Sequence, residues 1–440
     1  MSEQQFEPKR SVMDSKGNMR PKDRIALTPV IVTLTLSLLC LTGCSIVAEK
    51  IVLNHPKVKK LFETPLPDRT LSGKAWTNSI GDGTNRILVL HLTGSNYFSL
   101  GYNQGRLLAR EIQAAYEDAF AGAEKQIPRK AAEKLSAGGK RRIVHHVLGE
   151  AWKKMRPFVS AEELEEMEGL AAGLRDAGIV GIDLPTIHHL NAIPDFSQMG
   201  CSGVIAYGDA TRGDVWQMRV LDYGLELGLH KRPMITVYHP VNTFDNTIVN
   251  IGWVGLAGMV TGVNNRAVAI SEMRYNSIEG KTLAGEPMVF LMKRSLRFGN
   301  SAPEVVSIMR SAKRTNGYGY LVGDREKNAI GVLASANEFV EFRPNTAKVL
   351  ERGKDVLPQY KDVLYCGHYN DRQAASVQKL HGTLALSTLQ EMALSIAPES
   401  NLQVVVFNLT TGDLWVANKR GKGRAADTTY VKFPRDAWEK

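Results

Sequence analysis

Strand-like segments dominate the chain after residue 200, and their arrangement is the feature that most limits the fold. Short runs rich in β-branched and aromatic residues follow one another there, with few helical patterns between them. Because strands and helices come in blocks rather than in strict alternation, the pattern predicts an α+β fold of antiparallel sheets with helices layered on them. The expected strands are residues 204–207, 215–222, 235–239, 248–254, 267–271, 320–323, 329–334, 339–342, 402–407 and 414–417, and the expected helices are residues 287–298, 301–311 and 388–396.

The N-terminal 43 residues have the pattern of a secretory leader. Residues 25–43 are apolar and nearly uncharged, and basic residues precede them. The run ends in Leu41-Thr42-Gly43-Cys44, which resembles the bacterial lipoprotein cleavage box. The resemblance implies that residues 1–43 are removed as a signal peptide and that Cys44 carries the lipid. The alternative is a transmembrane anchor formed by the same apolar run. Ser45 after the lipid cysteine favours the periplasmic side of an outer membrane, so we expect a lipid-anchored protein of the cell envelope.

The segment between the leader and the strand-rich half divides into a tether and a mostly helical part. Residues 44–85 contain three prolines and scattered charges, which indicates an irregular tether. Residues 86–200 begin with a strand at 86–92 and continue with helical patterns. One of these helices is expected to begin at Ser160, where Ser160 and Glu163 form a capping box.

A glycine-spaced segment at residues 94–105 leads from the first strand into a helix expected from about Arg106 to Phe120. The glycines suggest a phosphate-binding loop, but no Gly-Lys-Ser/Thr sequence follows them. The segment therefore predicts a tight junction between strand and helix.

The positive charge of the chain favours anionic surfaces or substrates over nucleic acid. The formal net charge is +10, and the basic residues are spread along the whole sequence. No zinc-finger or RNA-binding pattern accompanies them, so we expect no nucleic-acid partner. The neighbouring His188 and His189 lack the further ligands of a metal site, and we expect neither a metal nor a cofactor.

Two cysteines, Cys201 and Cys366, lie outside the leader and its cleavage box. A disulfide between them is one interpretation, but it would consume the thiol that the surroundings of Cys201 single out. A free cysteine is most often a small buried core residue, and that alternative stays open for Cys201. A third alternative is a thiol enzyme with a histidine as base. The candidate bases are His188, His189, His230 and His239.

The residues around Cys201 favour a nucleophile that is exposed by self-cleavage after Gly200. A thiol needs a base to attack at neutral pH, and a new α-amine on Cys201 would supply one with a pKa of about 7.7–8.0. Glycine before the cut tolerates the strained backbone that an internal attack needs. Arg219 would favour the thiolate and Asp222 would hold the amine, unless the two are a surface ion pair.

The motifs around Cys201 resemble those of the N-terminal-nucleophile hydrolases. The likeness is greatest to the penicillin acyltransferase-like autoproteolytic proteins and their acid-ceramidase-like relatives, and bile-salt hydrolases are more distant. It extends over residues 85–440, and each motif alone is weak while the combination is fairly specific. The matching segments are Gly200-Cys201-Ser202, residues 211–214, residues 219–223, residues 94–105, residues 258–264, residues 362–365 and residues 416–418.

The resemblance implies a four-layer αββα fold and a cut into an α-chain that ends at Gly200 and a β-chain, residues 201–440. It implies that the two chains stay associated and hydrolyse the C–N amide bond of a small N-acyl substrate, or transfer its acyl group. A non-catalytic envelope lipoprotein with the same fold is the further alternative. Carried over by position, Cys201 is the nucleophile, and Arg219 and Asp222 match the family's arginine and aspartate.

The oxyanion hole is the part of the site for which the motifs give the weakest match. Asn316 is the candidate donor, although its Asn-Gly sequence is equally typical of a turn. Where bile-salt hydrolases place an asparagine, this chain has Ser271-Glu272-Met273. The departure leaves both the oxyanion donors and the substrate pocket open.

Overall fold

The computed structural model describes residues 70–196, 200–274, 280–346, 351–352, 355–367 and 370–439. All of them belong to one compact unit that begins at Pro65. The predictions for the leader and for Cys44 lie outside the described residues. The predicted tether was too long, because residues 75–80 form strand β1 (Ala75–Ile80), which pairs with β2 (Ile87–Leu92). Among the described helices, none is both long and apolar enough to cross a membrane.

The described strands form two large sheets and one small one. The nine-stranded sheet has the order β1-β2-β5-β6-β7-β8-β9-β10-β11, and the six-stranded sheet has the order β14-β3-β4-β15-β16-β17. Neighbouring strands are antiparallel except β2 and β5, which are parallel. The remaining strands are β5 (Pro233–Tyr238), β6 (Ile248–Trp253), β7 (Thr261–Asn264), β8 (Ala269–Arg274), β9 (Tyr318–Gly323), β10 (Ala329–Ala334), β11 (Phe339–Phe342), β14 (Val363–Gly367), β3 (Gly200–Ala206), β4 (Trp216–Asp222), β15 (Asn401–Asn408), β16 (Leu414–Asn418), β17 (Val431–Phe433) and the pair β12 (Glu351–Arg352) and β13 (Asp355–Val356).

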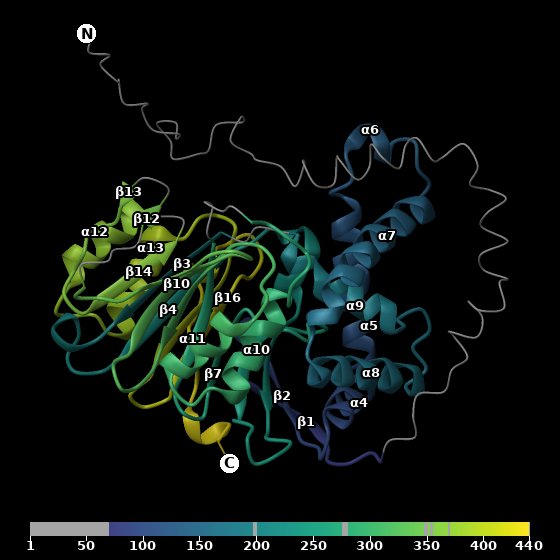
Figure 1. Ribbon diagram of the computed structural model, residues 1–440, viewed down its shortest axis with the longest axis horizontal. Helices are drawn as coiled ribbons and strands as arrows, with labels where there is room; N and C mark the ends of the chain where they lie inside the picture. Colours follow the sequence, from purple (N-terminus) through teal and green to yellow (C-terminus); the bar gives the residue numbers. More distant parts are fainter. Residues whose placement is uncertain are drawn as a thin grey trace, which may run out of the picture. The chain divides into compact units, whose positions relative to one another are not determined.

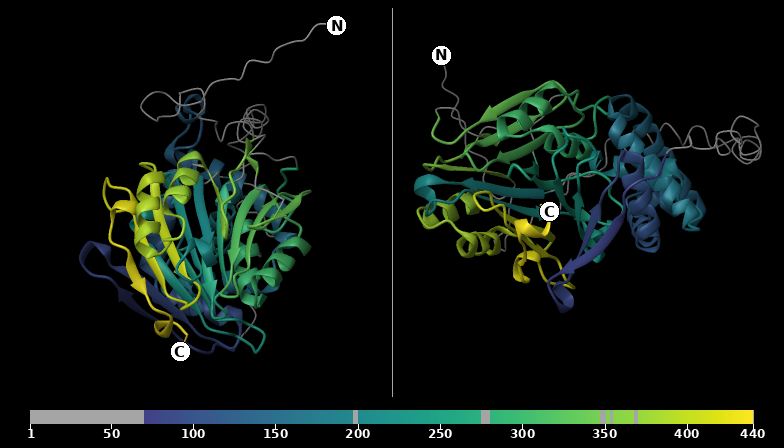
Figure 2. Two further views of the ribbon diagram at one scale, coloured as in Figure 1. Left: turned by 90° about the vertical axis from the view of Figure 1, so that its left-hand side faces the viewer. Right: turned by 90° about the horizontal axis from the view of Figure 1, so that it is seen from below.

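The two large sheets pack face to face and carry helices on their outer faces. Helices α10 (Met288–Phe298) and α11 (Ala302–Ser311) cover the nine-stranded sheet, and α12 (Asn370–Leu380) and α13 (Leu386–Ile396) cover the six-stranded sheet (Figure 2). Between the sheets, β3 packs against β8 and β9. The predicted α+β fold of four layers is therefore confirmed.

The helices that precede Cys201 gather beside the two sheets (Figure 1). They are α4 (Tyr97–Leu107), α5 (Ala109–Glu124), α6 (Arg129–Ala132), α7 (Ala137–Met155), α8 (Ala161–Asp176) and α9 (Leu184–Ala192). The first helix begins earlier than predicted, because Asn96 accepts a hydrogen bond from the amide of Ser99 and caps it. Gly101 is inside α4 rather than at a junction, and a Cβ there would lie 1.9 Å from the carbonyl oxygen of Glu166 on α8. The glycine thus permits close packing of two helices.

The predicted capping box at the start of α8 is wrong in one respect. Ser160 is the N-cap residue, but its hydroxyl makes no capping hydrogen bond. The Glu163 carboxylate instead turns into the interior, where it lies 2.9 Å from Lys293 and 3.0 Å from Arg297. A buried carboxylate needs a cationic partner more than a surface helix end needs a cap.

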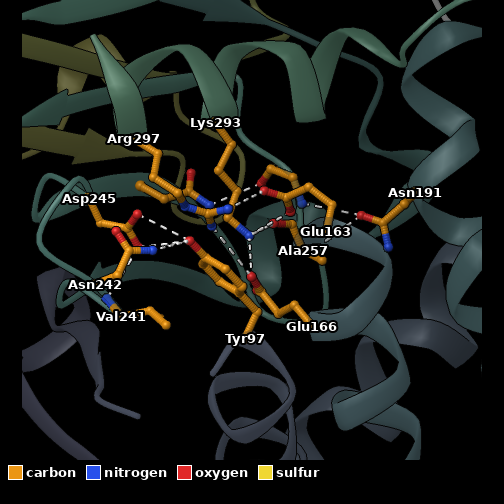
Figure 3. A network of polar contacts seen from close by, with 12 residues as sticks. Tyr97, Glu163, Glu166, Asn191, Val241, Asn242, Asp245, Ala257, Lys293 and Arg297 are labelled. Atoms are coloured by element: carbon orange, nitrogen blue, oxygen red, sulfur yellow. Dashed lines mark hydrogen bonds and ion pairs between the residues drawn. The ribbon is translucent and has the colours of Figure 1, made fainter. Parts of the chain in front are cut away.

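A buried cluster of charges joins α8 to α10 (Figure 3). Lys293 lies 2.9 Å from Glu163 and 2.7 Å from Glu166, and Arg297 pairs with the same two carboxylates. These four side chains are almost completely buried. Their charges balance, which is the condition under which buried charges are tolerated. The cluster therefore connects the part of the chain before Cys201 with the part after it.

Candidate active site

Cys201 lies on β3 at the interface between the two sheets, and its side chain is completely buried. Strand register places Gly203 opposite Arg219 of β4, so Cys201 and Arg219 are diagonal neighbours on one face. The Arg219 Nη2 atom lies 3.1 Å from the Cys201 sulfur. From the facing sheet, Glu272 of β8 places Oε2 3.5 Å from the sulfur and 2.7 Å from Arg219 Nη2. A thiol, a guanidinium and a carboxylate thus meet at one point.

Arg219 is held in place at each of its nitrogen positions. Its Nε donates to the main-chain carbonyl of Glu272 at 2.8 Å, and its Nη1 donates to the Thr261 hydroxyl of β7 at 2.6 Å. Arg219 and Glu272 are each 1% exposed. The alternative of a surface ion pair with Asp222 is therefore wrong, since the ion-pair partner of Arg219 is Glu272. A guanidinium fixed in this way needs no rearrangement before it acts on the sulfur.

The surroundings of Cys201 act on the ionisation of its thiol in opposite directions. Burial raises the pKa of Cys201 well above its usual value, Arg219 lowers it, and the nearby carboxylates of Glu272 and Asp222 raise it again. We expected Arg219 to favour the thiolate, and its charge acts in that direction, but burial and the two carboxylates outweigh it. The thiol can instead donate its proton toward Glu272 Oε2.

Asp222 lies beside the peptide bond at which the sequence predicts the cut. It is paired with Gly200 across strands β4 and β3, and a Cβ on Gly200 would lie 3.8 Å from Asp222 Oδ2. Burial raises the pKa of Asp222 well above its usual value, and Asn401 donates to the other carboxylate oxygen at 3.4 Å. In the described part of the chain, Oδ2 has no hydrogen-bond partner. The Oδ2 atom of Asp222 is therefore a buried hydrogen-bond acceptor that lies close to Gly200, the residue before Cys201.

Asn316 makes no hydrogen bond to the Cys201 thiol in the structure. Its side-chain amide donates to the main-chain carbonyl of Asp195, which lies before Gly200 in the sequence. Asn316 precedes β9, and Tyr320 of that strand is paired with Glu272 of β8. Asn316 is therefore near the strand pair that carries the site, without a hydrogen bond to Cys201.

Glu272 and Thr261 are the site residues that the sequence analysis missed. Glu272 was noted only as a departure from the bile-salt hydrolase pattern. The available signal was a lone carboxylate within the apolar run 267–273, because a charge in a buried strand requires a partner. Thr261 lies in the central segment 258–264, whose resemblance to a family motif was recognised without a role for the hydroxyl.

Three of the four histidines considered as bases pack against other aromatic or imidazole rings. His188 stacks on Trp152, with 4.3 Å between ring centroids, and burial lowers the pKa of His188 to about 3. His189 lies 2.9 Å from His145, and His239 stacks with His91. Among the described residues, the hydrogen-bond partners of the Cys201 sulfur are Arg219 and Glu272, and no histidine is one of them. The histidines therefore give no support to a Cys–His pair.

The alternative of a disulfide finds no support in the described residues. Cys201 and Cys366 are both free and buried. Within the described ranges, no group of three or more His, Cys, Asp or Glu side chains is placed to hold a metal ion.

A largely apolar cavity that is partly open to solvent is lined by residues next in sequence to two residues of the site. Tyr223, which follows Asp222, and Val260, which precedes Thr261, form part of its wall. Ile193 and Pro194 line it from the segment before the predicted cut. Its other lining residues are Ala115, Ala119, Leu190, Leu227, Gly228, Leu229, Arg232, Trp253, Val254 and Leu256. The cavity therefore presents an apolar surface at the residues that follow Asp222 and precede Thr261.

Comparison with curated proteins finds two similar proteins of Dictyostelium discoideum. The chain is 27% identical to protein dcd1B over 308 residues, which are 67% of this chain and 60% of that protein. It is 25% identical to protein dcd1A over 381 residues, which are 80% of this chain and 82% of that protein. No family model matches the chain. Neither protein name states an activity, so the chemistry has to come from the site itself.

Comparison with solved structures finds hydrolases of the group that the motifs around Cys201 resemble. The chain is similar to the N-acylethanolamine-hydrolysing acid amidase ortholog of Caenorhabditis elegans, with a TM-score of 0.39 and 13% identity over 48% of this chain and 93% of that chain. It is also similar to a mutant of the conjugated bile acid hydrolase of Clostridium perfringens, with a TM-score of 0.36 and 12% identity over 54% of this chain and 92% of that chain. Because both TM-scores are low, these likenesses carry no weight for the chemistry of this chain.

Proposed function

We propose that the chain is a self-cleaving N-terminal-nucleophile amidase whose nucleophile is Cys201. The observation that carries the proposal is the contact of the Cys201 sulfur with Arg219 and Glu272, with Asp222 beside Gly200. A structural cysteine needs none of these three charged groups, and burying them costs free energy that a purely structural site would not recover.

In the proposed cut, the thiol attacks the carbonyl carbon of Gly200 within its own backbone. Glu272 takes the proton from the sulfur, and the sulfur forms a bond to the Gly200 carbonyl carbon. The C–N bond then breaks as the amide nitrogen of Cys201 takes up a proton, which leaves a thioester. Water hydrolyses the thioester and leaves a carboxylate on Gly200 and a free thiol and α-amine on Cys201. Glu272 fills the role of base here, because the α-amine does not exist before the cut.

In the proposed turnover, the freed α-amine replaces Glu272 as the base. Asp222 Oδ2, which has free acceptor capacity, would hold this amine. The sulfur attacks the amide carbonyl of an N-acyl substrate, the leaving amine takes the proton from the α-amine, and water hydrolyses the acyl-enzyme. We assign the Asn316 amide as a donor to the oxyanion. It can take this role once it no longer donates to the main-chain carbonyl of Asp195 at the end of the α-chain.

The cavity beside the site favours substrates with an apolar acyl group. Activity on fluorogenic N-acyl amides is expected to rise about three- to four-fold for each added methylene until the cavity is filled, since each buried methylene contributes about 0.8 kcal/mol. The measurement is kcat/KM on a series of acyl chains of increasing length. Leu227→Trp, in the cavity wall, should shorten the preferred chain, while Leu394→Trp on the exposed face of α13 serves as the control. Equal rates for short and long acyl groups would rule out this substrate class.

We propose that the two chains stay together after the cut. The cluster of Lys293, Arg297, Glu163 and Glu166 joins the α-chain to the β-chain and is buried on both sides. Separation would expose two unpaired carboxylates on one chain and two unpaired cations on the other. The cluster therefore favours a stable two-chain protein.

The lipid anchor at Cys44 remains a proposal that is independent of catalysis. Cys44→Ala is expected to release the protein from membranes or to stall its processing, because the modified sulfur is the proposed attachment point. A fatty-acid probe in growing cells measures the label, and Cys40→Ala inside the leader is the matched control. Absence of label on a wild-type protein that stays out of the membrane fraction would refute the anchor.

A further inference from the structure

A buried carboxyl group fixes the end of the α-chain to the β-chain shortly before the proposed cut. Asp195 ends a short 3-10 turn, Ile193–Asp195, five residues before Gly200, and it is 3% exposed. The Thr315 hydroxyl donates to Asp195 Oδ1, and the Tyr318 hydroxyl lies 3.5 Å from the same oxygen. Both donors belong to the β-chain.

The main chain of the same segment is held by the same part of the β-chain. Asn316 donates to the carbonyl of Asp195, and the Tyr318 hydroxyl donates to the carbonyl of Pro194 at 3.2 Å. The amide of Met288, at the start of α10, also favours the charged form of the Asp195 carboxyl. Burial raises the pKa of Asp195 to about 7 against these donors. The turn Ile193–Asp195 thus accepts several buried hydrogen bonds from the β-chain, which indicates a specific attachment rather than a chance contact.

The attachment is linked to the strand pair that carries the reacting groups. Tyr318 and Tyr320 are separated by one residue on β9, and their ring centroids lie 6.3 Å apart. Tyr318 faces Asp195, and Tyr320 is paired with Glu272 on β8, whose carboxylate contacts the Cys201 sulfur. The end of the α-chain is therefore attached to β9, the strand that pairs with the Glu272 strand β8.

We propose that Asp195 is a positioning residue for self-cleavage, which holds the α-chain end on β9 so that the Gly200–Cys201 bond stays aligned with the sulfur and Glu272. The proposal rests on the proposed function, because it assigns a role only within the internal cut. Alignment matters there because an intramolecular attack gains most of its rate from a fixed geometry, and a small displacement costs much of that gain. After the cut, Asp195 has no part in turnover.

The test compares the rate of cutting with the activity of molecules already cut. In Asp195→Asn, conversion of the full-length chain into two chains should slow about 10- to 100-fold, since alignment of the bond is lost. Activity on N-lauroyl aminomethylcoumarin, divided by the amount of cut protein, should stay within about two-fold of wild type, because Asp195 touches no reacting atom of turnover. Thr315→Val removes one donor, keeps the carboxyl, and should slow the cut less in the same direction.

Asp176→Asn is the matched control, since that carboxylate also accepts a tyrosine hydroxyl, but its hydrogen-bond partners among the described residues, Tyr102 and Arg175, both belong to the α-chain. It should cut at the wild-type rate. Cutting at the wild-type rate in both Asp195→Asn and Thr315→Val would overturn the positioning role. So would a parallel loss of cutting and of activity per cut molecule. A wild-type chain that stays whole would overturn the proposed function itself, which is a separate result.

Discussion

Replacing Cys201 by alanine is expected to leave one full-length chain that hydrolyses no amide. The variant removes the sulfur that attacks both the Gly200 carbonyl and the substrate, so the cut and the turnover fail together. Loss of a nucleophile typically lowers kcat by a factor on the order of 10⁶. Intact mass and N-terminal sequencing of the purified protein measure the cut, and wild type should show a β-chain that begins at Cys201. Cys201→Ser should cut slowly, since a hydroxyl is the poorer nucleophile.

Cys366→Ala is the control for this experiment. Cys366 is also free and buried, and it lies on β14, the strand next to β3. Burial raises the pKa of Cys366 to about 12, and no role in the cut is assigned to it. The variant should be cut and active. Active wild-type enzyme in which Cys201 is still bonded to Gly200 would contradict self-cleavage. It would favour the alternative mechanism, in which a histidine is the base.

Arg219→Ala is expected to destabilise the fold and to abolish cutting. The change leaves the Glu272 carboxylate buried without its cation, which costs about 3–5 kcal/mol. For a compact unit that extends from Pro65 to Lys440, that loss lowers Tm by about 4–6 °C. Thermal unfolding of the variant and of wild type, followed by circular dichroism, measures the difference. Arg175→Ala is the matched control, because its ion pair with Asp176 is exposed and contributes less than about 1 kcal/mol.

A double variant separates the stability of the site from its chemistry. Arg219→Met combined with Glu272→Leu removes both charges and keeps the volume, so much of the lost stability should return. The chain should nevertheless stay whole, because neither the cation beside the sulfur nor the base is present. An uncut but stable double variant supports a chemical role for the pair. Normal cutting in Arg219→Ala, with a Tm close to that of the Arg175→Ala control, would show that the pair has neither role.

Most of the strands, and the closeness of Arg219 to Cys201, could be predicted from local patterns in the sequence. Residues 329–334 were predicted as a strand and form β10, because short apolar runs of this kind are buried in sheets wherever they pair. The strands on either side of the turn at residues 211–214 were predicted as well, and their antiparallel pairing brings Arg219 to Cys201. Local patterns were sufficient there, since strand pairing across one turn fixes which residues are neighbours.

The distant groups that contact Cys201 and the α-chain could not be predicted, because packing between layers brings them together. Glu272 reaches the Cys201 sulfur across 71 residues of sequence, and Glu163 reaches Lys293 across 130. The residues Ser160 and Glu163 have the local pattern of a capping box. In the folded chain, however, Glu163 is buried and pairs with two cations instead of capping the helix. Asp195 was not singled out, because its donors come from β9 and α10 and become its neighbours only when the sheets and helices pack. Such contacts depend on how the sheets and helices pack against one another. The periodicity of apolar residues within one segment does not predict that packing.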